Sequence, residues 1–331
     1  IVLVLLPPSA SAGELPRLHV AGNRLETPDG KAVNLRGVSL CSLSYNDPQS
    51  LLQTLAHRQN GWNADVVRLP VQPDEWKRIG ADHYITDDLD PAVRQCRDAG
   101  FYCIIDWHEV ADWQDEQTIR ALDAFWRKVA PRYKDDPFIF YEVFNEPKNP
   151  GDQTLKNWRA YRARAQQWVD EIRKEAPDTI LLVGSPRWSQ MAGFAAQEPL
   201  IGENLVYTFH LYHGSPREDW DGLFGNASEK IPLFVSEWGW SSLLRNRMTP
   251  FYGTREGFAM PVKQYLNEHP QISWTAWSYD PACGPAMLGK DREMGDFVRS
   301  WLQEHRAEIS PAMSLPDSDG KNASASSRRR G

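Results

Sequence analysis

Two glutamates stand where hydrophobic runs of the chain end. Glu146 follows the run 138–144, and Glu237 lies in the run "PLFVSEW" at residues 232–238. A buried carboxylate is costly without a partner, so such a glutamate is either a salt-bridged structural residue or an acid that a strand carries to a working face. Two carboxylates in one cleft can hydrolyse a glycosidic bond, as acid/base and nucleophile, if the gap is about 5 Å. A wider gap would indicate inversion, and spacing along the chain does not give the gap.

Other reactive side chains also lie in or just after hydrophobic runs. These candidates are Arg68, His108, Asn145, His210, Tyr212 and Trp277. Three of them also have a plain structural interpretation: Arg68 as an ion-pair residue, His108 as a core histidine and Asn145 as the cap of a turn. Glu142, which lies inside a run, is interpreted as the buried partner of a basic group.

Several of the 14 tryptophans lie at or just after the ends of the runs. Pyranose rings present C–H faces that pack on aromatic planes, so a row of tryptophans suits a sugar-binding cleft. We therefore add Trp188 and Trp240 to Trp277 as candidate substrate-binding residues. The alternative for each of them is packing in the core or in a loop.

Two other kinds of catalytic site are disfavoured. The segment "HEVAD" at residues 108–112 begins like a zinc-binding H-E-x-x-H motif, but residue 112 is Asp. No G-x-S-x-G motif occurs, which weakens a serine-hydrolase interpretation. We expect neither a metal ion nor an organic cofactor.

Eight short runs rich in β-branched and aromatic residues supply the elements that would position these side chains. They cover residues 33–40, 65–71, 101–109, 138–147, 179–186, 205–213, 232–240 and 272–280. The runs are apolar almost throughout, which is typical of parallel strands buried on both faces. Stretches with helical periodicity separate them, as at residues 88–100, 118–130 and 155–177. In the first of these, Asp90 is the expected N-cap and Gly100 the expected stop.

Eight strand–helix units predict an α/β protein with a (β/α)8 barrel, preceded by short hairpins over residues 18–35. The alternative is a doubly wound open sheet, but no G-x-G-x-x-G follows the first strand and no P-loop occurs. In a barrel, residues at the carboxyl ends of the strands meet at one face. Glu146 and Glu237 lie on the fourth and seventh strands, which we expect to face each other across the barrel mouth.

The net charge and the two ends of the chain give further expectations about partners, location and domain limits. The net charge of −7 and the pI near 5.7 argue against a nucleic acid or an anionic membrane as partner. Residues 1–12 resemble the remnant of a signal peptide that ends at Ala10-Ser11-Ala12, which predicts a secreted or periplasmic protein; a frayed apolar terminus is the alternative. We expect one catalytic domain over residues 13–310 and a disordered tail over 311–331.

Over about residues 18–309 the chain resembles glycoside hydrolase family 5, the cellulase-like retaining β-glycosidases of clan A. The resemblance rests on the segments "VVRLPV", "IIDWHE", "FNEP", "FHLYH", "VSEWG" and "WTAWSYD". It implies that Glu146 is the acid/base and Glu237 the nucleophile. It also implies supporting roles: Arg68 and Tyr212 hold Glu237, His108 lines the −1 subsite, Asn145 contacts the sugar 2-hydroxyl, His210 completes the His-x-Tyr pair, and Trp277 forms the floor of the −1 subsite.

The resemblance implies a secreted enzyme that cleaves β-1,4-glucan with retention, an endoglucanase. One alternative is a β-mannanase, another hemicellulase or another β-glucan hydrolase on the same scaffold. An alternative from a different class is a non-catalytic carbohydrate-binding barrel, which would not need two converging acids. The expected partner is a β-linked polysaccharide or oligosaccharide, bound by a monomer.

The four cysteines, Cys41, Cys96, Cys103 and Cys283, are too few for a disulfide scaffold and lack C-x-x-C spacing. The first and eighth strands of a barrel are neighbours, so Cys41 can reach Cys283. A bridge between them would pin the rim of the cleft and stabilise the fold. Free buried thiols are the alternative.

Overall fold

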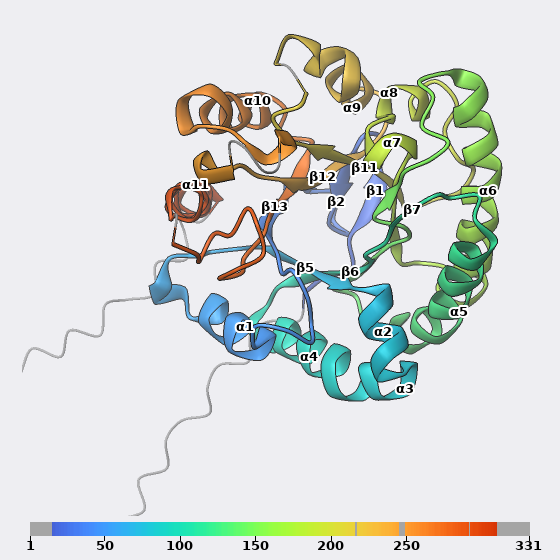
Figure 1. The fold of residues 1–331 in the computed structure, drawn as a ribbon, viewed down its shortest axis with the longest axis horizontal. Coiled ribbons are helices and arrows are strands. Elements are labelled where there is room, and N and C mark those ends of the chain that lie inside the picture. Colours follow the sequence, from blue (N-terminus) through green and yellow to red (C-terminus); the bar gives the residue numbers. More distant parts are fainter. Residues whose placement is uncertain (1–14, 216, 245–248, 291, 310–331) are drawn as a thin grey trace, which may run out of the picture.

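The computed structural model describes residues 15–215, 217–244, 249–290 and 292–309, which form a (β/α)8 TIM barrel (Figure 1). Eight parallel strands close into a ring in the order β4–β5–β6–β8–β10–β11–β12–β13. The ring closes where β13 pairs with β4, with Trp274 opposite Arg36 and Trp277 opposite Ser39. The predicted fold class is confirmed.

Each strand of the ring lies within one of the predicted runs. The strands are β4 (Arg36–Ser39), β5 (Val66–Val71), β6 (Tyr102–Trp107), β8 (Ile139–Glu142), β10 (Ile180–Val183), β11 (Leu205–Leu211), β12 (Leu233–Trp238) and β13 (Ser273–Trp277). Every residue of these strands is buried. Helices cover the outer face of the ring and side chains fill its interior, so the strands need no polar face.

Helices surround the ring. They are α1 (Pro48–Ala56), α2 (Pro73–Ile79), α3 (Ala81–His83), α4 (Asp90–Ala99), α5 (Glu116–Tyr133), α6 (Leu155–Glu175), α7 (Pro186–Ser189), α8 (Ala192–Ala195), α9 (Asn226–Ser228), α10 (Met260–Glu268) and α11 (Glu293–Ile309). Short 3₁₀ and π segments join them: η1 (Arg58–Asn60), η2 (Tyr84–Leu89), η3 (Arg217–Asp219), η4 (Asp221–Gly225), η5 (Ser242–Leu244), η6 (Thr249–Phe251) and η7 (Arg255–Ala259).

Local sequence explains where the two longest helices begin. Asp115 accepts a hydrogen bond from the backbone N–H of Thr118 at 2.8 Å and starts α5. Thr154 accepts one from the backbone N–H of Asn157 at 3.1 Å and starts α6. Such side chains satisfy N–H groups that have no partner within the helix.

The start of α4 differs from the sequence-based expectation. Gly100 ends this helix with a left-handed φ of 72°, as predicted. Asp90 is not an N-cap, because η2 runs directly into α4 and has already formed the preceding turn. The Asp90 carboxylate instead accepts hydrogen bonds from Arg132 at 2.8 Å and from Tyr133 at 2.6 Å.

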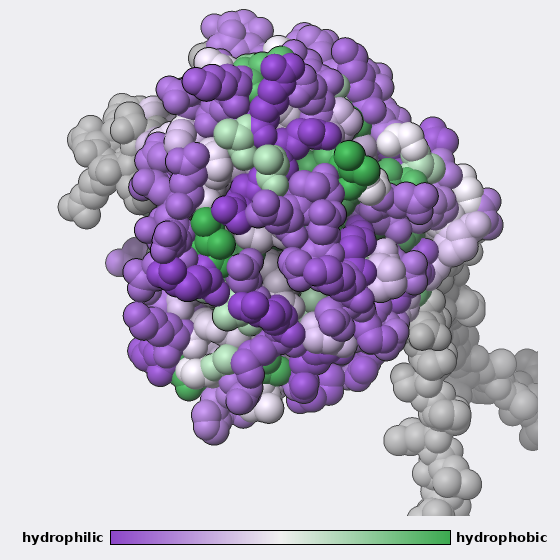
Figure 2. All heavy atoms as spheres, turned by 90° about the vertical axis from the view of Figure 1, so that its right-hand side faces the viewer, coloured by the Kyte–Doolittle hydropathy of each residue, from purple (hydrophilic) through white to green (hydrophobic). Residues whose placement is uncertain are grey.

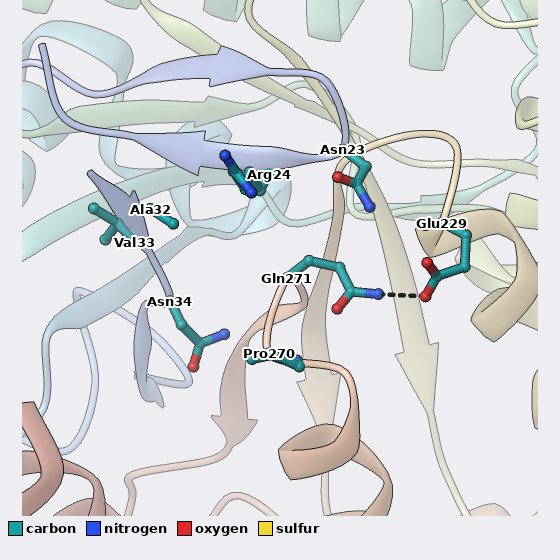
Figure 3. Close-up of a pocket in the computed structure, with 8 residues that line it drawn as sticks. All are labelled: Asn23, Arg24, Ala32, Val33, Asn34, Glu229, Pro270 and Gln271. Carbon is teal, nitrogen blue, oxygen red and sulfur yellow. Dashed lines mark hydrogen bonds between the residues drawn. The ribbon is translucent and has the colours of Figure 1, made fainter. Parts of the chain in front are cut away.

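A three-stranded antiparallel sheet of β1 (His19–Ala21), β2 (Arg24–Glu26) and β3 (Ala32–Val33) precedes the ring, in the region of the predicted hairpins. It covers the amino-terminal end of the barrel, where Asn23 donates a hydrogen bond to the Ser228 carbonyl at 2.8 Å, in the segment that leads to β12. A groove of about 380 Å³ lies between this sheet and the segment before β13, where Gln271 donates to Glu229 at 2.8 Å (Figure 3).

A helix that spans a membrane must be both long and apolar. Hydrophilic side chains cover most of the face in Figure 2, and hydrophobic residues form small separate spots on it. Within the described residues, no helix is long and apolar enough to cross a bilayer. The predicted signal-peptide remnant (1–12) and tail (311–331) lie outside the described residues, so the domain limits at both ends stay predictions.

Candidate active site

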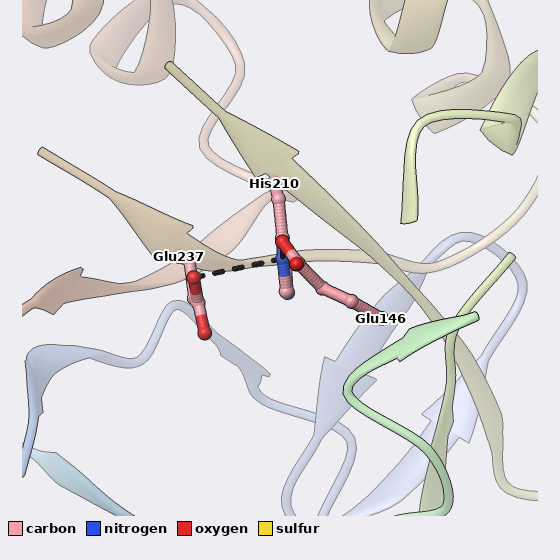
Figure 4. Close-up of side chains that lie close together, drawn as sticks. All are labelled: Glu146, His210 and Glu237. Carbon is pink, nitrogen blue, oxygen red and sulfur yellow. Dashed lines mark hydrogen bonds and ion pairs between the residues drawn. The ribbon is translucent and has the colours of Figure 1, made fainter. Parts of the chain in front are cut away.

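Polar side chains from several strands meet at the carboxyl end of the ring. Glu146 lies on β9 (Glu146–Pro147), which pairs with β7 (Val110–Ala111) beyond the ends of β8 and β6. His210 lies on β11 and Glu237 on β12. One side-chain atom of each of these three residues lies within 4.8 Å of the other two (Figure 4). The two glutamates that the sequence singled out therefore converge.

The route to this convergence differs from the one we expected. Two strands, β10 and β11, stand between β8 and β12 in the ring, so the strands of the two glutamates are not directly opposite. The carboxyl groups still meet, because β9 carries Glu146 past the end of β8 and His210 projects from β11 between them.

Glu237 is buried and held by two donors. Arg68 Nη1 lies 2.8 Å from Glu237 Oε1, and the Tyr212 hydroxyl donates to Glu237 Oε2 at 2.7 Å. Burial alone would raise the pKa of Glu237, but His210, Arg68 and the Tyr212 hydroxyl outweigh it and hold that pKa below its ordinary value. Glu237 is therefore ionised at neutral pH.

Arg68 lies in the middle of β5, not at its end, and its fully buried guanidinium reaches the site through the barrel interior. Besides Glu237, it contacts Glu142 Oε2 at 2.6 Å, Asp106 Oδ2 at 2.9 Å and Asn145 Oδ1 at 2.6 Å. Burial would lower the pKa of Arg68, but the three carboxylates raise it above its ordinary value. Arg68 is thus a permanent cation that neutralises part of a buried acidic cluster.

His210 is fully buried and links the two glutamates. Its Nδ1 lies 2.7 Å from Glu146 Oε1 and 3.6 Å from Glu237 Oε2. Burial would lower the pKa of His210, but Glu237, Glu142 and Glu146 outweigh it and raise the pKa to about 10. The imidazole therefore carries a positive charge at neutral pH, and both of its nitrogens donate hydrogen bonds.

The cluster of Glu146, His210 and Glu237 is compact enough to hold a metal ion, but its chemistry does not suit one. A metal ligand must offer a lone pair, and a protonated imidazole has none to offer. The Arg68 guanidinium also lies 2.8 Å from Glu237 and occupies the position of a counter-charge there.

His108 and Trp277 form a flat wall beside this cluster. Their rings stack with centroids 4.8 Å apart and planes only 5° from parallel. Asp106 Oδ2 fixes the histidine by a 2.7 Å contact with Nδ1. Trp277 is buried, with 7% of its surface exposed, and the Arg68 guanidinium lies 6.0 Å from its ring centroid.

Trp188 is the most exposed of the candidate residues, with 42% of its surface accessible. It lies in a turn in which the φ angles of Arg187, Trp188 and Ser189 are between 56° and 63°, a left-handed conformation that residues with a Cβ rarely adopt. The Ser189 hydroxyl donates to the Asn145 carbonyl at 2.7 Å and anchors the turn beside Glu146.

Trp240 does not fit the role of a sugar-stacking residue that the sequence analysis gave it. Only 1% of its surface is exposed. It stacks on Trp238 with ring centroids 6.1 Å apart and meets the edge of Phe297 in α11 at 5.4 Å. Position after a strand end did not distinguish it from Trp188, because the Trp240 ring packs against Trp238 and against Phe297 of α11.

Three polar residues of the site were absent from the sequence-based candidates: Asp106, Glu142 and Ser236. All three are fully buried. The interpretation of Glu142 as the partner of a basic group agrees with its 2.6 Å contact with Arg68. The available signal was a polar residue inside an otherwise apolar strand, since such a residue must find its partner within the barrel.

The rim of the site is tied together by a disulfide between Cys41 and Cys283, with an S–S distance of 2.06 Å. Beside it, Asn46 donates to both carboxylate oxygens of Asp280 at 3.1 Å. These contacts join the loops after β4 and β13, which are neighbours in the ring. Cys96 and Cys103 are free and buried.

A closed (β/α)8 barrel with two carboxylates this close at the carboxyl ends of its strands is typical of TIM-barrel glycoside hydrolases. Sequence comparison gives the particular family. The chain belongs to the cellulase family, glycosyl hydrolase family 5, whose sequence model matches residues 27–282.

Individual relatives agree with this family. An endoglucanase of Microbulbifer sp. is 29% identical over 80% of this chain and 51% of its own length. Endoglucanase E-5 of Thermobifida fusca is 26% identical over 87% of this chain and 64% of its own length. The chain thus spans about half to two thirds of the length of these relatives.

Solved structures extend the similarity to the fold. A β-glucanase of Saccharophagus degradans superposes with a TM-score of 0.77 at 25% identity, over 87% of this chain and 93% of that one, and it has also been solved with cellotetraose. The catalytic domain of a Thermobifida fusca endoglucanase superposes with a TM-score of 0.71 at 25% identity, over 87% of this chain and 97% of that one.

Proposed function

We propose that this chain is a secreted endo-β-1,4-glucanase that cleaves its substrate with retention, with Glu237 as nucleophile and Glu146 as acid/base. The observation that carries the proposal is the approach of the two carboxylates to within 4.8 Å. Retaining glycosidases hold their two carboxyl groups about 5–5.5 Å apart, whereas inverting enzymes need about 6.5–9.5 Å to admit a water molecule. The gap in this chain fits direct attack by a carboxylate.

In the first step, ionised Glu237 attacks the anomeric carbon and protonated Glu146 gives its proton to the leaving glycosidic oxygen. Arg68 and Tyr212 hold Glu237 in place and ionised. The product is a glycosyl ester of Glu237. In the second step, Glu146 is a carboxylate and takes a proton from water, which attacks the anomeric carbon and releases Glu237.

The remaining candidates surround the place where the sugar would lie. Trp277, backed by His108, supplies an aromatic face beside the two acids, and Asn145 precedes the acid/base in the chain. Trp188 supplies a second, exposed face farther along the rim. Two aromatic residues near the acids support a substrate of several linked sugars, which we expect a single chain to bind as a monomer.

The relatives support β-glucan as substrate, because those named above are endoglucanases and a structural neighbour was solved with cellotetraose. The alternative substrate is a β-mannan or another hemicellulose on the same scaffold. The two acids act on the β-glycosidic bond and do not by themselves distinguish glucose from its epimer mannose. Export is supported by the Cys41–Cys283 disulfide, because such bonds persist in oxidising compartments. A non-catalytic binding barrel is disfavoured by the two converging acids.

A panel of carboxymethylcellulose, lichenan, mannan and xyloglucan, assayed by reducing-end release, tests the proposal. We expect activity on carboxymethylcellulose and its near-complete loss in Glu146→Gln and Glu237→Gln, with oligosaccharide binding kept. Glu109→Gln is the matched control, because that side chain bonds Trp107 at 2.8 Å, outside the cluster of acids, and should keep the wild-type rate.

Azide distinguishes the roles of the two acids. In Glu237→Ala, azide should restore turnover of an activated β-glucoside and give the glycosyl azide of inverted configuration, because the small anion replaces the missing carboxylate. Turnover by Glu237→Ala without an added nucleophile would refute its role. Activity on mannan alone would move the substrate to the alternative while leaving the two acids in their roles.

A further inference from the structure

Glu142 and Ser236 are fully buried polar residues of the barrel interior that have no role in the proposed reaction. Glu142 is on β8 and Ser236 on β12, directly before Glu237. Ser236 Oγ donates to Glu142 Oε1 at 2.9 Å and lies 3.1 Å from His210 Nε2. The other ring nitrogen of His210 lies 2.7 Å from Glu146 Oε1. A continuous chain of hydrogen bonds thus runs from Glu142 through Ser236 and His210 to Glu146.

The donors and acceptors along this chain can be assigned. Burial would raise the pKa of Glu142, but Arg68 and His210 hold it at about 2, so Glu142 is ionised and can only accept. A serine hydroxyl has one proton, which Ser236 gives to Glu142. Ser236 must therefore accept from His210, so Nε2 of the ring carries a proton in every state in which this chain is intact.

We propose that Glu142 and Ser236 are positioning residues that keep His210 protonated, with Nε2 donating to Ser236 and Nδ1 donating to Glu146. The inference rests on the proposed function of Glu146 as acid/base. Across the 2.7 Å contact, Nδ1 donates to Glu146 Oε1 both when Glu146 carries its proton on its other oxygen and when it is ionised. This donation stabilises the carboxylate that remains once Glu146 has protonated the leaving oxygen.

The charges around His210 give this assignment a pH dependence. The groups that face the ring are Glu142 from β8, Glu146 from β9 and Glu237 from β12, with Arg68 from β5 behind Glu142 and Glu237. Tyr212, on the strand of His210, bonds Glu237. Glu142 Oε1 is 3.9 Å from His210 Nε2, too far for a direct hydrogen bond, so the Ser236 hydroxyl is the link between them.

Ser236→Ala removes that link. We expect the alkaline limb of the pH profile of kcat/KM to move to lower pH by about one unit. The reason is that the protonated His210 ring loses a charge-assisted hydrogen bond and so gives up its proton more easily. Glu142→Gln should move the limb in the same direction, and Ser236→Thr, which keeps the hydroxyl, should restore it. Thr275→Val is the matched control: it deletes a buried hydroxyl that bonds only the backbone carbonyl of Ser236, at 2.6 Å, and should leave the limb unchanged.

A purely structural role makes a different prediction. If Ser236→Ala lowers kcat/KM by the same factor at every pH, the proposal is overturned. Nitrogen-15 NMR of the wild-type histidines tests it without any variant: His210, assigned by the loss of its signals in His210→Asn, should keep Nε2 protonated across the pH range. A neutral ring protonated at Nδ1 would overturn the proposal. Failure of the proposed function would appear separately, as absent hydrolysis by the wild type.

Discussion

Replacing Arg68 with methionine should destabilise the barrel more than any exposed charge replacement. Arg68 is fully buried and contacts three carboxylates, those of Asp106, Glu142 and Glu237, at 2.6 to 2.9 Å. Removing one partner of a buried ion pair costs about 3–5 kcal/mol, because the other charge stays buried without compensation. We therefore expect a loss of about 4 kcal/mol, out of a total that is typically 5–15 kcal/mol.

The loss of stability in Arg68→Met should depend on pH, and the direction of that dependence follows from the pKa of Glu142. Burial would raise that pKa, but Arg68 and His210 hold it at about 2, below the unfolded value of about 4.3. In the wild type this carboxylate contributes stability above the unfolded value, which is lost as the pH falls toward 2. Without Arg68, burial raises the pKa, so the variant is penalised at pH 7 and relieved as the pH falls. The difference in the free energy of unfolding between wild type and variant should therefore decrease toward pH 4.

Urea unfolding followed by tryptophan fluorescence at pH 7 and near pH 4 measures both effects. For a chain of 331 residues, a loss of 4 kcal/mol corresponds to a fall in melting temperature of roughly 6 °C. Arg159→Met is the matched control, because Arg159 pairs with Glu198 at the surface, where ion pairs contribute little. If the two variants unfold alike, or if Arg68→Met loses more at low pH than at neutral pH, the electrostatic account of this cluster is wrong.

Two further predictions concern the rim and the tryptophans. The double replacement Cys41→Ser and Cys283→Ser removes a link between residues 242 positions apart and should lower the free energy of unfolding by about 3–5 kcal/mol. Reductant should lower the melting temperature of the wild type but not that of the variant. Equal responses of the two proteins would contradict this prediction. Trp188→Ala should weaken oligosaccharide binding about tenfold at an unchanged melting temperature, because its ring is exposed. Trp240→Ala should instead lower the free energy of unfolding by about 3–5 kcal/mol and leave the affinity of the folded protein for oligosaccharide unchanged. If Trp188→Ala lost stability and Trp240→Ala lost affinity, the exposed position of Trp188 and the buried position of Trp240 would both be wrong.

The alternation of strands and helices around the ring (Figure 1) could be predicted from the sequence. Parallel strands buried on both faces leave long apolar runs, and the helices between them leave amphipathic stripes; both are local patterns. The limits of single elements were less predictable. Asp90 is a good N-cap by type, but η2 had already formed the preceding helical turn, and no local pattern at Asp90 shows this.

By itself, the sequence determined the eight strands of the ring and the place of the two acids in or just after their apolar runs, because hydrophobic periodicity and polar residues at the ends of runs are properties of short segments. Only the tertiary structure decided the 4.8 Å approach of those acids, the burial of Trp240 and the exposure of Trp188. It also decided the chain of hydrogen bonds from Glu142 through Ser236 to His210. Distances and burial depend on how separate strands are twisted and staggered around the ring, and no single segment carries that information.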